Sequence, residues 1–260
     1  MNLLITIYRY RELIYNLILR DIKARAKQSF LGYAWMIIPP VFQMVIFSIL
    51  FQGILNLRLS GEIPYPLFLY CALVPWQFFS EGIRTATISI VNNAGLIRQV
   101  YFPKEVLIFS SITGKLFDFV ISVIILTGLI IFYQINVSLT IFYVPFLLLI
   151  QMIMMTGVSF FLSSVNTYYR DIGTGIVLLM QIWMYASPII YPISKVPPNF
   201  LLIYKINPMV GIIDGFRRVI IEGIPPQWNL ILYSVSFSFI LLLSTYLFFK
   251  KLEPSFADTV

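Results

Sequence analysis

Six long apolar runs, separated by shorter polar connections, constrain this chain more than any other feature. A bilayer core about 30 Å thick is crossed by a helix of about 20 apolar residues, so each run is long enough to span it. Only helices and closed barrels satisfy their backbone groups in lipid, and these runs lack the alternation of barrel strands. We therefore predict an all-α polytopic membrane protein with six transmembrane helices, at roughly residues 33–55, 66–90, 106–133, 141–164, 173–191 and 229–249.

The composition agrees with a membrane protein and excludes several kinds of chemistry. Of the 260 residues, 59% are hydrophobic and 11% are charged, whereas soluble domains carry about 25% charged residues. The formal charge of +7 does not indicate nucleic-acid binding, because the basic residues flank the apolar runs. The chain has no histidine and one cysteine, Cys71, which removes histidine-based catalysis, histidine metal sites and any internal disulfide. We expect no catalytic, metal-binding or cofactor-binding residues in it.

The distribution of Lys and Arg predicts the orientation in the membrane. If the N-terminus is cytoplasmic, eleven Lys and Arg residues fall in the segments on the cytoplasmic side and five on the opposite side. Cytoplasmic connections carry the excess of basic residues in membrane proteins. Both termini are therefore predicted to be cytoplasmic.

Residues 1–31 form a separate segment before the transmembrane domain of residues 32–260. Polar residues recur there at spacings of three and four, and apolar residues share the other face, as in a helix lying along a membrane surface. Such a helix serves either as a surface anchor or as a docking surface for a cytoplasmic partner. The polar positions are Arg9, Glu12, Asn16, Arg20, Lys23 and Lys27.

Four ionisable residues lie inside the predicted spans. Glu81 and Arg84 in the second span, and Lys115 and Asp118 in the third, are each spaced i, i+3, so each pair can meet on one helix face. The two pairs can also face each other across the helices. Their role is either structural, by pairing inside the bundle or by snorkelling to the inner interface, or functional, as an ion or proton relay or the polar lining of a path.

The segment of residues 192–228, before the last span, is rich in proline yet still apolar. Asn207 followed by Pro208 is typical of a helix start, and apolar residues then keep helical spacing up to Gly223. This pattern predicts an amphipathic helix that is re-entrant or interfacial, because it is too short to span a membrane. Its polar residues, expected to face water or a lumen, are Asp214, Arg217, Arg218 and Glu222.

The connection NNAGLIRQVYFPKEV at residues 92–106 carries Val100, Tyr101 and Phe102 in a row where water would be the expected neighbour. Clustered aromatic and aliphatic side chains in a polar connection indicate a contact surface for a partner. The alternative is an aromatic anchor at the membrane interface.

Four stretches of the sequence carry a resemblance to a known family. They are LGYAWMIIPP at 31–40, NAGLIRQVYFPKEVL at 93–107, YYRDIGTGIVLLMQIWMYASPIIYP at 168–192 and INPMVGIIDGFRRVIIEGIPP at 206–226. Together they resemble the membrane-spanning subunits of ABC exporters of cell-surface polysaccharides, the O-antigen and teichoic acid permeases. The order and spacing of the stretches make the match specific, and it covers essentially the whole chain.

The resemblance implies a homodimer whose helices enclose a channel, powered by two copies of a separate cytoplasmic ATPase that uses ATP and Mg. This fits the sequence, because its one Gly-Lys pair, Gly114-Lys115, lies in a span and lacks the rest of a P-loop. The implied substrate is a lipid-linked polysaccharide, O-antigen or teichoic-acid-like, exported across the bacterial inner membrane. The chain is then a transport subunit and not an enzyme.

The resemblance also assigns roles to residues. It places an ATPase coupling helix at about residues 93–105 and outer gate helices at about residues 192–228. The implied coupling residues are Leu96, Ile97, Arg98, Val100, Tyr101, Phe102, Pro103 and Lys104. Further residues of the ATPase interface are Arg20, Lys23, Lys27, Arg170 and Asp171. The outer gate residues are Asn207, Pro208, Asp214, Arg217 and Arg218.

Aromatic residues of spans one, two and five are our candidates for a channel lining. Aromatic faces stack on sugar rings without holding one hydroxyl pattern strongly, and weak repeated sites allow a polymer to slide, as they do for ions in pores. For each residue taken alone, packing or lipid contact is the alternative. The candidates are Trp35, Phe42, Trp76, Phe79, Trp183 and Tyr185.

Three other classes of function stay open. An ABC exporter of a drug, lipid, haem or other small molecule would share the scaffold and differ in the lumen. An ion-coupled secondary transporter would need an unpaired intramembrane carboxylate or inverted repeats, and neither is evident. An intramembrane enzyme would need a cluster of catalytic groups, for which only the paired carboxylates are available.

Overall fold

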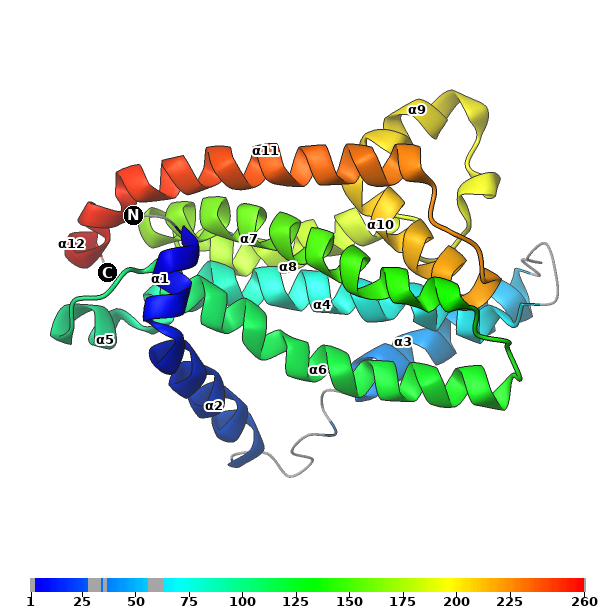
Figure 1. Ribbon diagram of the computed structural model, residues 1–260, viewed down its shortest axis with the longest axis horizontal. Coiled ribbons are helices and arrows are strands. Elements are labelled where there is room, and N and C mark those ends of the chain that lie inside the picture. The colour runs from blue at the N-terminus through cyan, green and yellow to red at the C-terminus, as the bar shows by residue number, and fades with distance from the viewer. Residues whose placement is uncertain (1–2, 28–33, 35–36, 56–62, 260) are drawn as a thin grey trace.

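The computed structural model describes residues 3–27, 34, 37–55 and 63–259. In these ranges every regular element is a helix and no strand occurs, which confirms the predicted all-α fold class. Four long helices lie side by side along the long axis of the molecule (Figure 1). They are α4 (Tyr65–Asn92), α6 (Glu105–Phe132), α7 (Val144–Tyr168) and α11 (Trp228–Leu252).

Shorter helices complete the described part of the chain. Those of α type are α1 (Leu3–Arg9), α2 (Arg11–Lys27), α3 (Ile38–Phe47), α5 (Ala94–Gln99), α8 (Asp171–Tyr185), α9 (Pro198–Ile206), α10 (Pro208–Arg217) and α12 (Phe256–Thr259). The wider π-helical turns are η2 (Ser48–Ile54), which continues α3, and η5 (Arg218–Glu222), which continues α10. The tighter 3-10 turns are η3 (Leu139–Tyr143), η4 (Ile193–Lys195) and η6 (Glu253–Ser255).

Within the described part of the chain, three helical stretches are long and apolar enough to cross a membrane: Glu105–Phe132, Leu139–Tyr168 and Trp228–Ser255. They coincide with the third, fourth and sixth predicted spans. The stretches Ile38–Ile54 and Asp171–Tyr185 are apolar but shorter. Helix α4 has the length of a span, but most of its residues are buried. Its side chains therefore contact protein more than lipid. The count of six spans remains a prediction.

Helix α4 lies at the centre of the packing, because it contacts α3, α6, α7, α8 and α10. It contains an interior proline, Pro75. The fully buried Gln151 of α7 donates a hydrogen bond from Nε2 to the carbonyl oxygen of Pro75 at 2.5 Å. This bond joins α7 to α4 at the position of the proline.

Two glycines allow close approach of helices to α11. A Cβ at Gly157 of α7 would lie 3.0 Å from the backbone nitrogen of Leu242, and a Cβ at Gly211 of α10 would lie 2.8 Å from the carbonyl oxygen of Leu230. Backbone atoms cannot swing aside as a side-chain tip can. Helices α7 and α10 therefore approach α11 closely, because glycine has no side chain at these two positions.

The N-terminal helix has the amphipathic character that the sequence predicted. Ile14 and Leu17 of α2 are buried, while Glu12 and Asn16 are exposed. The apolar face of α2 packs on α6, so this face meets protein and not only the membrane surface. The side chain of Lys27 is outside what the structure describes.

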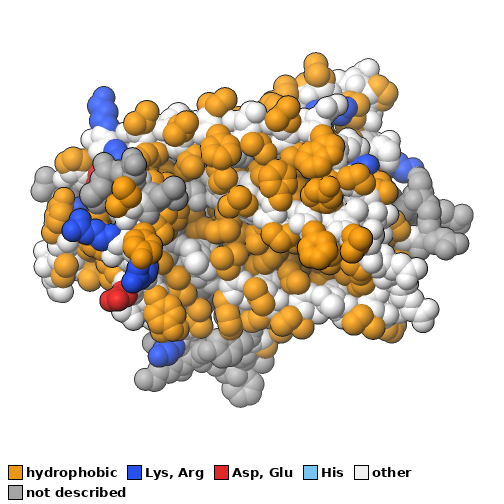
Figure 2. All heavy atoms as spheres, viewed as in Figure 1, with side chains coloured by type: hydrophobic (Ala, Val, Ile, Leu, Met, Phe, Trp, Pro, Cys, Tyr) orange, Lys and Arg blue, Asp and Glu red, His pale blue; other side chains and the backbone are white. Residues whose placement is uncertain are grey.

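Both chain ends lie at one end of the bundle, together with α5 and α12, and α9 lies at the opposite end (Figure 1). Hydrophobic side chains cover the middle of the face in Figure 2, and Lys and Arg gather toward its ends. An apolar middle between two more polar ends is the pattern that a bilayer imposes. The cytoplasmic location of the termini stays a prediction.

Candidate functional site

A large cavity of about 980 Å³ lies among helices α3, α4, α6 and α8. Its walls combine aromatic, amide and charged side chains. A concave site of this size with a few convergent polar groups is the usual form of a binding site. We call this site the central cavity.

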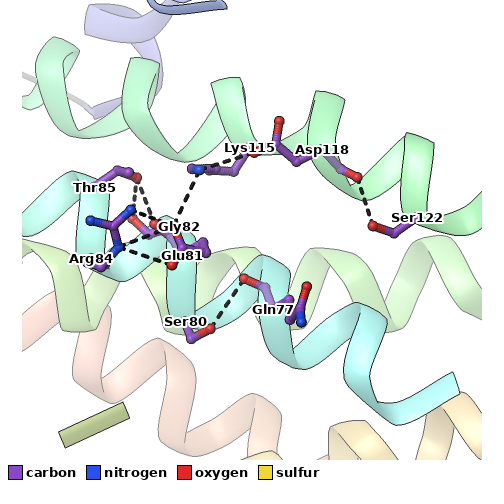
Figure 3. Close-up of polar contacts among 9 residues, drawn as sticks. All are labelled: Gln77, Ser80, Glu81, Gly82, Arg84, Thr85, Lys115, Asp118 and Ser122. Atoms are coloured by element: carbon purple, nitrogen blue, oxygen red, sulfur yellow. Dashed lines mark hydrogen bonds and ion pairs between the residues drawn. The ribbon is translucent and has the colours of Figure 1, made fainter. Parts of the chain in front are cut away.

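The predicted ion pairs lie on the wall of the central cavity. Nη2 of Arg84 is 2.7 Å from Oε2 of Glu81, and Nζ of Lys115 is 3.1 Å from Oδ2 of Asp118. Lys115 of α6 also reaches across to Glu81 of α4, at 3.5 Å (Figure 3). The i, i+3 pairing is thus confirmed, and the two pairs face each other. All four groups form one connected chain of charges along the cavity wall. This mutual pairing supports a structural role for the four residues.

Three glutamines of the central cavity were not predicted from the sequence, because they are uncharged and lie within apolar runs. They are Gln43 of α3, Gln77 of α4 and Gln181 of α8. Nε2 of Gln77 donates to Oε1 of Gln43 at 3.3 Å, and Nε2 of Gln43 contacts Sδ of Met184 at 3.2 Å. We call these three residues the cavity glutamines. The sequence feature that indicates them is a glutamine within each of three apolar runs.

The six aromatic candidates for a channel lining divide into three groups. Phe42, Trp76 and Tyr185 line the central cavity. Phe79 is fully buried and packs edge-on against Trp183, with ring centroids 5.2 Å apart, and neither belongs to the cavity wall. Trp35 lies outside the described residues.

Asn207 begins α10 and also fastens it to the end of α8. Its Oδ1 accepts the N–H of Met209 at 3.0 Å and the indole N–H of Trp183 at 2.9 Å. Its Nδ2 donates to the carbonyl oxygen of Ala186. The predicted helix start at Asn207 and Pro208 is confirmed, and so is the end at Gly223, which adopts a left-handed φ of 67°. Whether this segment acts as an outer gate remains a prediction.

The expectation that Arg217 faces water or a lumen is wrong. Arg217 is buried and donates hydrogen bonds to three carbonyl oxygens, those of Phe68, Pro188 and Ile189. Its guanidinium also lies 3.6 Å from the ring centroid of Phe68. Arg217 therefore holds the segment after α8 against α4.

The position of Arg217 on its helix explains its burial. It follows Ile213 by four residues and precedes Ile220 by three, so it shares the face on which both of these residues are buried. Arg218 is only partly buried and donates to the carbonyl oxygen of Pro225. Glu222 is exposed, as expected.

Asp214 lies on α10, which is too short to cross a membrane, and it is only partly exposed. Its Oδ2 is buried and has no hydrogen-bond partner among the described residues. Burial raises the pKa of Asp214 to about 6, with nearby Arg218 opposing the rise. The folded protein therefore holds the proton of this carboxyl group to a higher pH than an ordinary aspartate does.

The coupling residues implied by the resemblance do not all face outward. Tyr101 is 90% exposed and Val100 is 55% exposed, whereas Phe102 is 2% exposed and belongs to the hydrophobic core. Ile97 is also buried, and Leu96 and Pro103 are partly buried. Arg98 is exposed. The implied coupling residues that are exposed are thus Arg98, Val100 and Tyr101, while Phe102 anchors the connection.

The connection of residues 93–105 is fastened to two other parts of the chain. Arg20 of α2 donates to Oδ1 of Asn93 at 2.9 Å, directly before α5. The backbone N–H of Lys104 donates to Oε1 of Glu253 at 2.9 Å, and the Lys104 ammonium lies 5.1 Å from the Tyr101 ring centroid. Movement of α5 would therefore be transmitted to both α2 and the end of α11.

The remaining residues assigned to an ATPase interface are exposed. They are Lys23 on α2, Arg170 directly before α8, and Asp171, the first residue of α8. These three side chains are therefore accessible in the described part of the chain.

The fold and the central cavity define a class of protein: an all-helical, largely apolar chain with a polar and aromatic cavity between its helices, as in membrane transporters. The chain belongs to the ABC-2 type transporter family, whose sequence pattern matches residues 12–221. It is accordingly a membrane permease and not an ATPase, and the predicted family resemblance is confirmed.

Proteins of known role show similarity over most of the chain. The O-antigen export system permease protein RfbA of Myxococcus xanthus is 26% identical over 256 residues, which cover 98% of this chain and 97% of that protein. A protein of the same name from Klebsiella pneumoniae is 27% identical over 241 residues, 92% and 91% of the two chains. The polysialic acid transport protein KpsM of Escherichia coli is 24% identical over 213 residues, 80% of each chain.

Proposed function

We propose that this chain is the membrane-spanning subunit of an ATP-driven exporter that moves a lipid-linked polysaccharide, O-antigen or teichoic-acid-like, out of the cytoplasm. The observation that carries the proposal is the similarity, over 98% of this chain and 97% of its relative, to a protein named for O-antigen export. The central cavity supports it, because aromatic rings and amides are groups that contact sugars. The site of action would be the bacterial inner membrane, with both termini in the cytoplasm.

Two copies of the chain would enclose the export channel. The exposed apolar residues beside the central cavity support this arrangement: Phe42 of α3 is 63% exposed and Ile182 of α8 is 58% exposed. Exposed apolar side chains at the open side of a cavity suit contact with a second copy as well as with lipid. A second copy would cover them and close the cavity into a channel.

The energy would come from two copies of a separate cytoplasmic ATPase, which would bind ATP and Mg, while this chain binds no nucleotide. Tyr101 and Val100 are exposed and directly follow α5. Helix α5 lies at the end of the bundle that holds both termini (Figure 1), where such a partner would dock. Closure of the ATPase on ATP would move α5. The bonds from Asn93 to Arg20 and from Lys104 to Glu253 would carry that movement to α2 and α11.

Co-purification of the ATPase tests the proposal. The tagged full chain is extracted from its native membranes in mild detergent, and its partners are identified by mass spectrometry. We expect a P-loop ATPase with the wild type and at least a tenfold loss with Tyr101→Ala, because exposed aromatic anchors dominate such contacts. Phe102 is left unchanged, since its removal would open a cavity in the core.

Phe142→Ala is the matched control, because Phe142 is 77% exposed in η3. This turn connects α6 to α7 at the end of the bundle away from α5 (Figure 1). This variant should retain the ATPase. If the wild type brings down no ATPase, the exporter proposal fails. If Tyr101→Ala retains it fully, only the coupling assignment fails.

A further inference from the structure

The charged groups around the central cavity cancel one another. Among the described residues of its wall, the acidic and basic side chains are two carboxylates, Glu81 and Asp118, and two cations, Arg84 and Lys115. Each cation lies within 3.1 Å of a carboxylate oxygen, and Lys115 has a second carboxylate at 3.5 Å. The described wall of the cavity therefore offers no surplus charge of either sign.

A charged polymer would pass such a site only at a cost. Pores that select ions present a surplus of the opposite charge, with rings of Asp or Glu for cations and Arg or Lys for anions. A glycan with a carboxylate or phosphate in each repeat would lose hydration inside the membrane and find Arg84 and Lys115 already neutralised. An uncharged glycan would meet no such barrier.

The cavity does offer uncharged hydrogen-bonding groups. The Oε1 atom of Gln77 and the whole amide of Gln181 have no hydrogen-bond partner among the described residues, and Gln43 donates only to a thioether sulfur, a weak acceptor. An amide presents both a donor and an acceptor, and so does a sugar hydroxyl. Two uncharged polar residues of the cavity wall, Gln77 and Ser80, lie one turn apart on α4, next to Glu81 (Figure 3).

We infer that the central cavity takes a neutral glycan, a polymer whose repeating sugars carry no carboxylate or phosphate. Its hydroxyls would meet the cavity glutamines, and its ring faces would meet the aromatic side chains of the wall. This inference rests on the proposed function and narrows it. It separates the chain from the relative named for polysialic acid, which is an anionic polymer.

The polymer retained by cells that lack the gene tests the inference and the function separately. The gene is deleted in its own host, and the polysaccharide that stays in the cytoplasm is purified and assayed for uronic acid, sialic acid and phosphate per repeat, with end groups counted apart. A retained neutral polymer supports both. A retained polymer with a charge in each repeat overturns the inference and leaves the exporter standing. Absence of any retained polymer overturns both.

Variants of the cavity glutamines test the contact itself. In the deletion strain, Gln77→Leu and Gln43→Leu should each lower the rate of appearance of surface polysaccharide about threefold or more, as expected for a lost hydrogen bond. Gln227→Leu is the control, since Gln227 is exposed directly before α11. Equal membrane abundance and equal ATPase co-purification show that the variants fold. Unchanged export by folded Gln77→Leu would overturn the contact between the amides and the glycan.

Discussion

Nζ of Lys250 lies 2.6 Å from Oε1 of Glu105, and this ion pair joins the end of α11 to the start of α6. Glu105 is fully buried, and Lys250 also lies 2.7 Å from Oε2 of Glu253. Since Glu253 accepts the N–H of Lys104, this cluster fastens the connection after α5 to the last long helix.

Replacing Lys250 by Met should destabilise the protein, because it leaves the buried carboxylate of Glu105 without its cation. Losing one partner of a buried pair costs roughly 3–5 kcal/mol, and partial exposure of Lys250 favours the low end. Thermal unfolding in detergent measures the change. Lys251→Met is the control, since Lys251 is exposed, and adding Glu105→Gln to Lys250→Met should restore part of the loss. Equal shifts for the two lysine variants would contradict the role of the pair.

Arg217→Lys should also lower stability, although it keeps the charge. A lysine ammonium cannot reproduce the planar fork that reaches the carbonyl oxygens of Phe68, Pro188 and Ile189. We expect a loss of roughly 3 kcal/mol from charged hydrogen bonds, measured by thermal unfolding. Arg218→Lys, next in the chain with one such bond to Pro225, should change stability much less. The assignment of Arg217 is refuted if the two variants unfold alike.

Gly211→Ala should push α10 away from α11. The added methyl group would lie 2.8 Å from the carbonyl oxygen of Leu230 and from Oγ of Ser234, and overpacking of this kind costs roughly 1–3 kcal/mol. Gly175→Ala in α8 is the opposite case, because nothing lies within 4 Å of the added atom. That change should stabilise the protein by about 0.4–1 kcal/mol. If thermal unfolding in detergent shows no change for Gly211→Ala, the close approach of α10 to α11 does not contribute to stability.

Asp214 should make stability depend on pH. Burial raises its pKa from 3.8 to about 6 in the folded protein, so between these values the folded state binds more protons than the unfolded state. Stability from this group therefore falls as pH rises through that window. Asp214→Asn should unfold at a higher temperature than the wild type above pH 6 and lose the advantage near pH 4. Glu222→Gln should weaken this pH dependence only slightly, because burial is the larger cause of the raised Asp214 pKa and the charge of Glu222 a smaller one. If Asp214→Asn keeps the wild-type pH profile, the prediction is wrong.

Local patterns in the sequence predicted the parts of this protein that depend on local contacts. The i, i+3 ion pairs and the start and end of the helix after Asn207 need only neighbours along one helix, and the structure has them as expected. The same apolar spacing places Arg217 on the buried face of its helix. Its charge instead led to the prediction that it faces water or a lumen, and that prediction was wrong. Position on a helix outweighed residue type there.

Other features depend on contacts that no local pattern contains. Phe102 lies in a connection without periodicity, so its inward orientation could not be separated from the outward orientation of Tyr101. The cavity glutamines come from three helices, and an uncharged amide barely alters the apolar character of a span. The pairing of Glu105 with Lys250 joins distant parts of the chain. These features needed the tertiary arrangement.

The shared location of the two chain ends makes a covalently linked pair of copies feasible. Because both ends lie at the same end of the bundle (Figure 1), a flexible linker from the last residue of one copy to the first residue of a second need not pass through the membrane. Such a tandem polypeptide would carry a substitution in one half only. It would reveal whether a passing sugar chain needs matching walls on both sides or is guided by one wall alone.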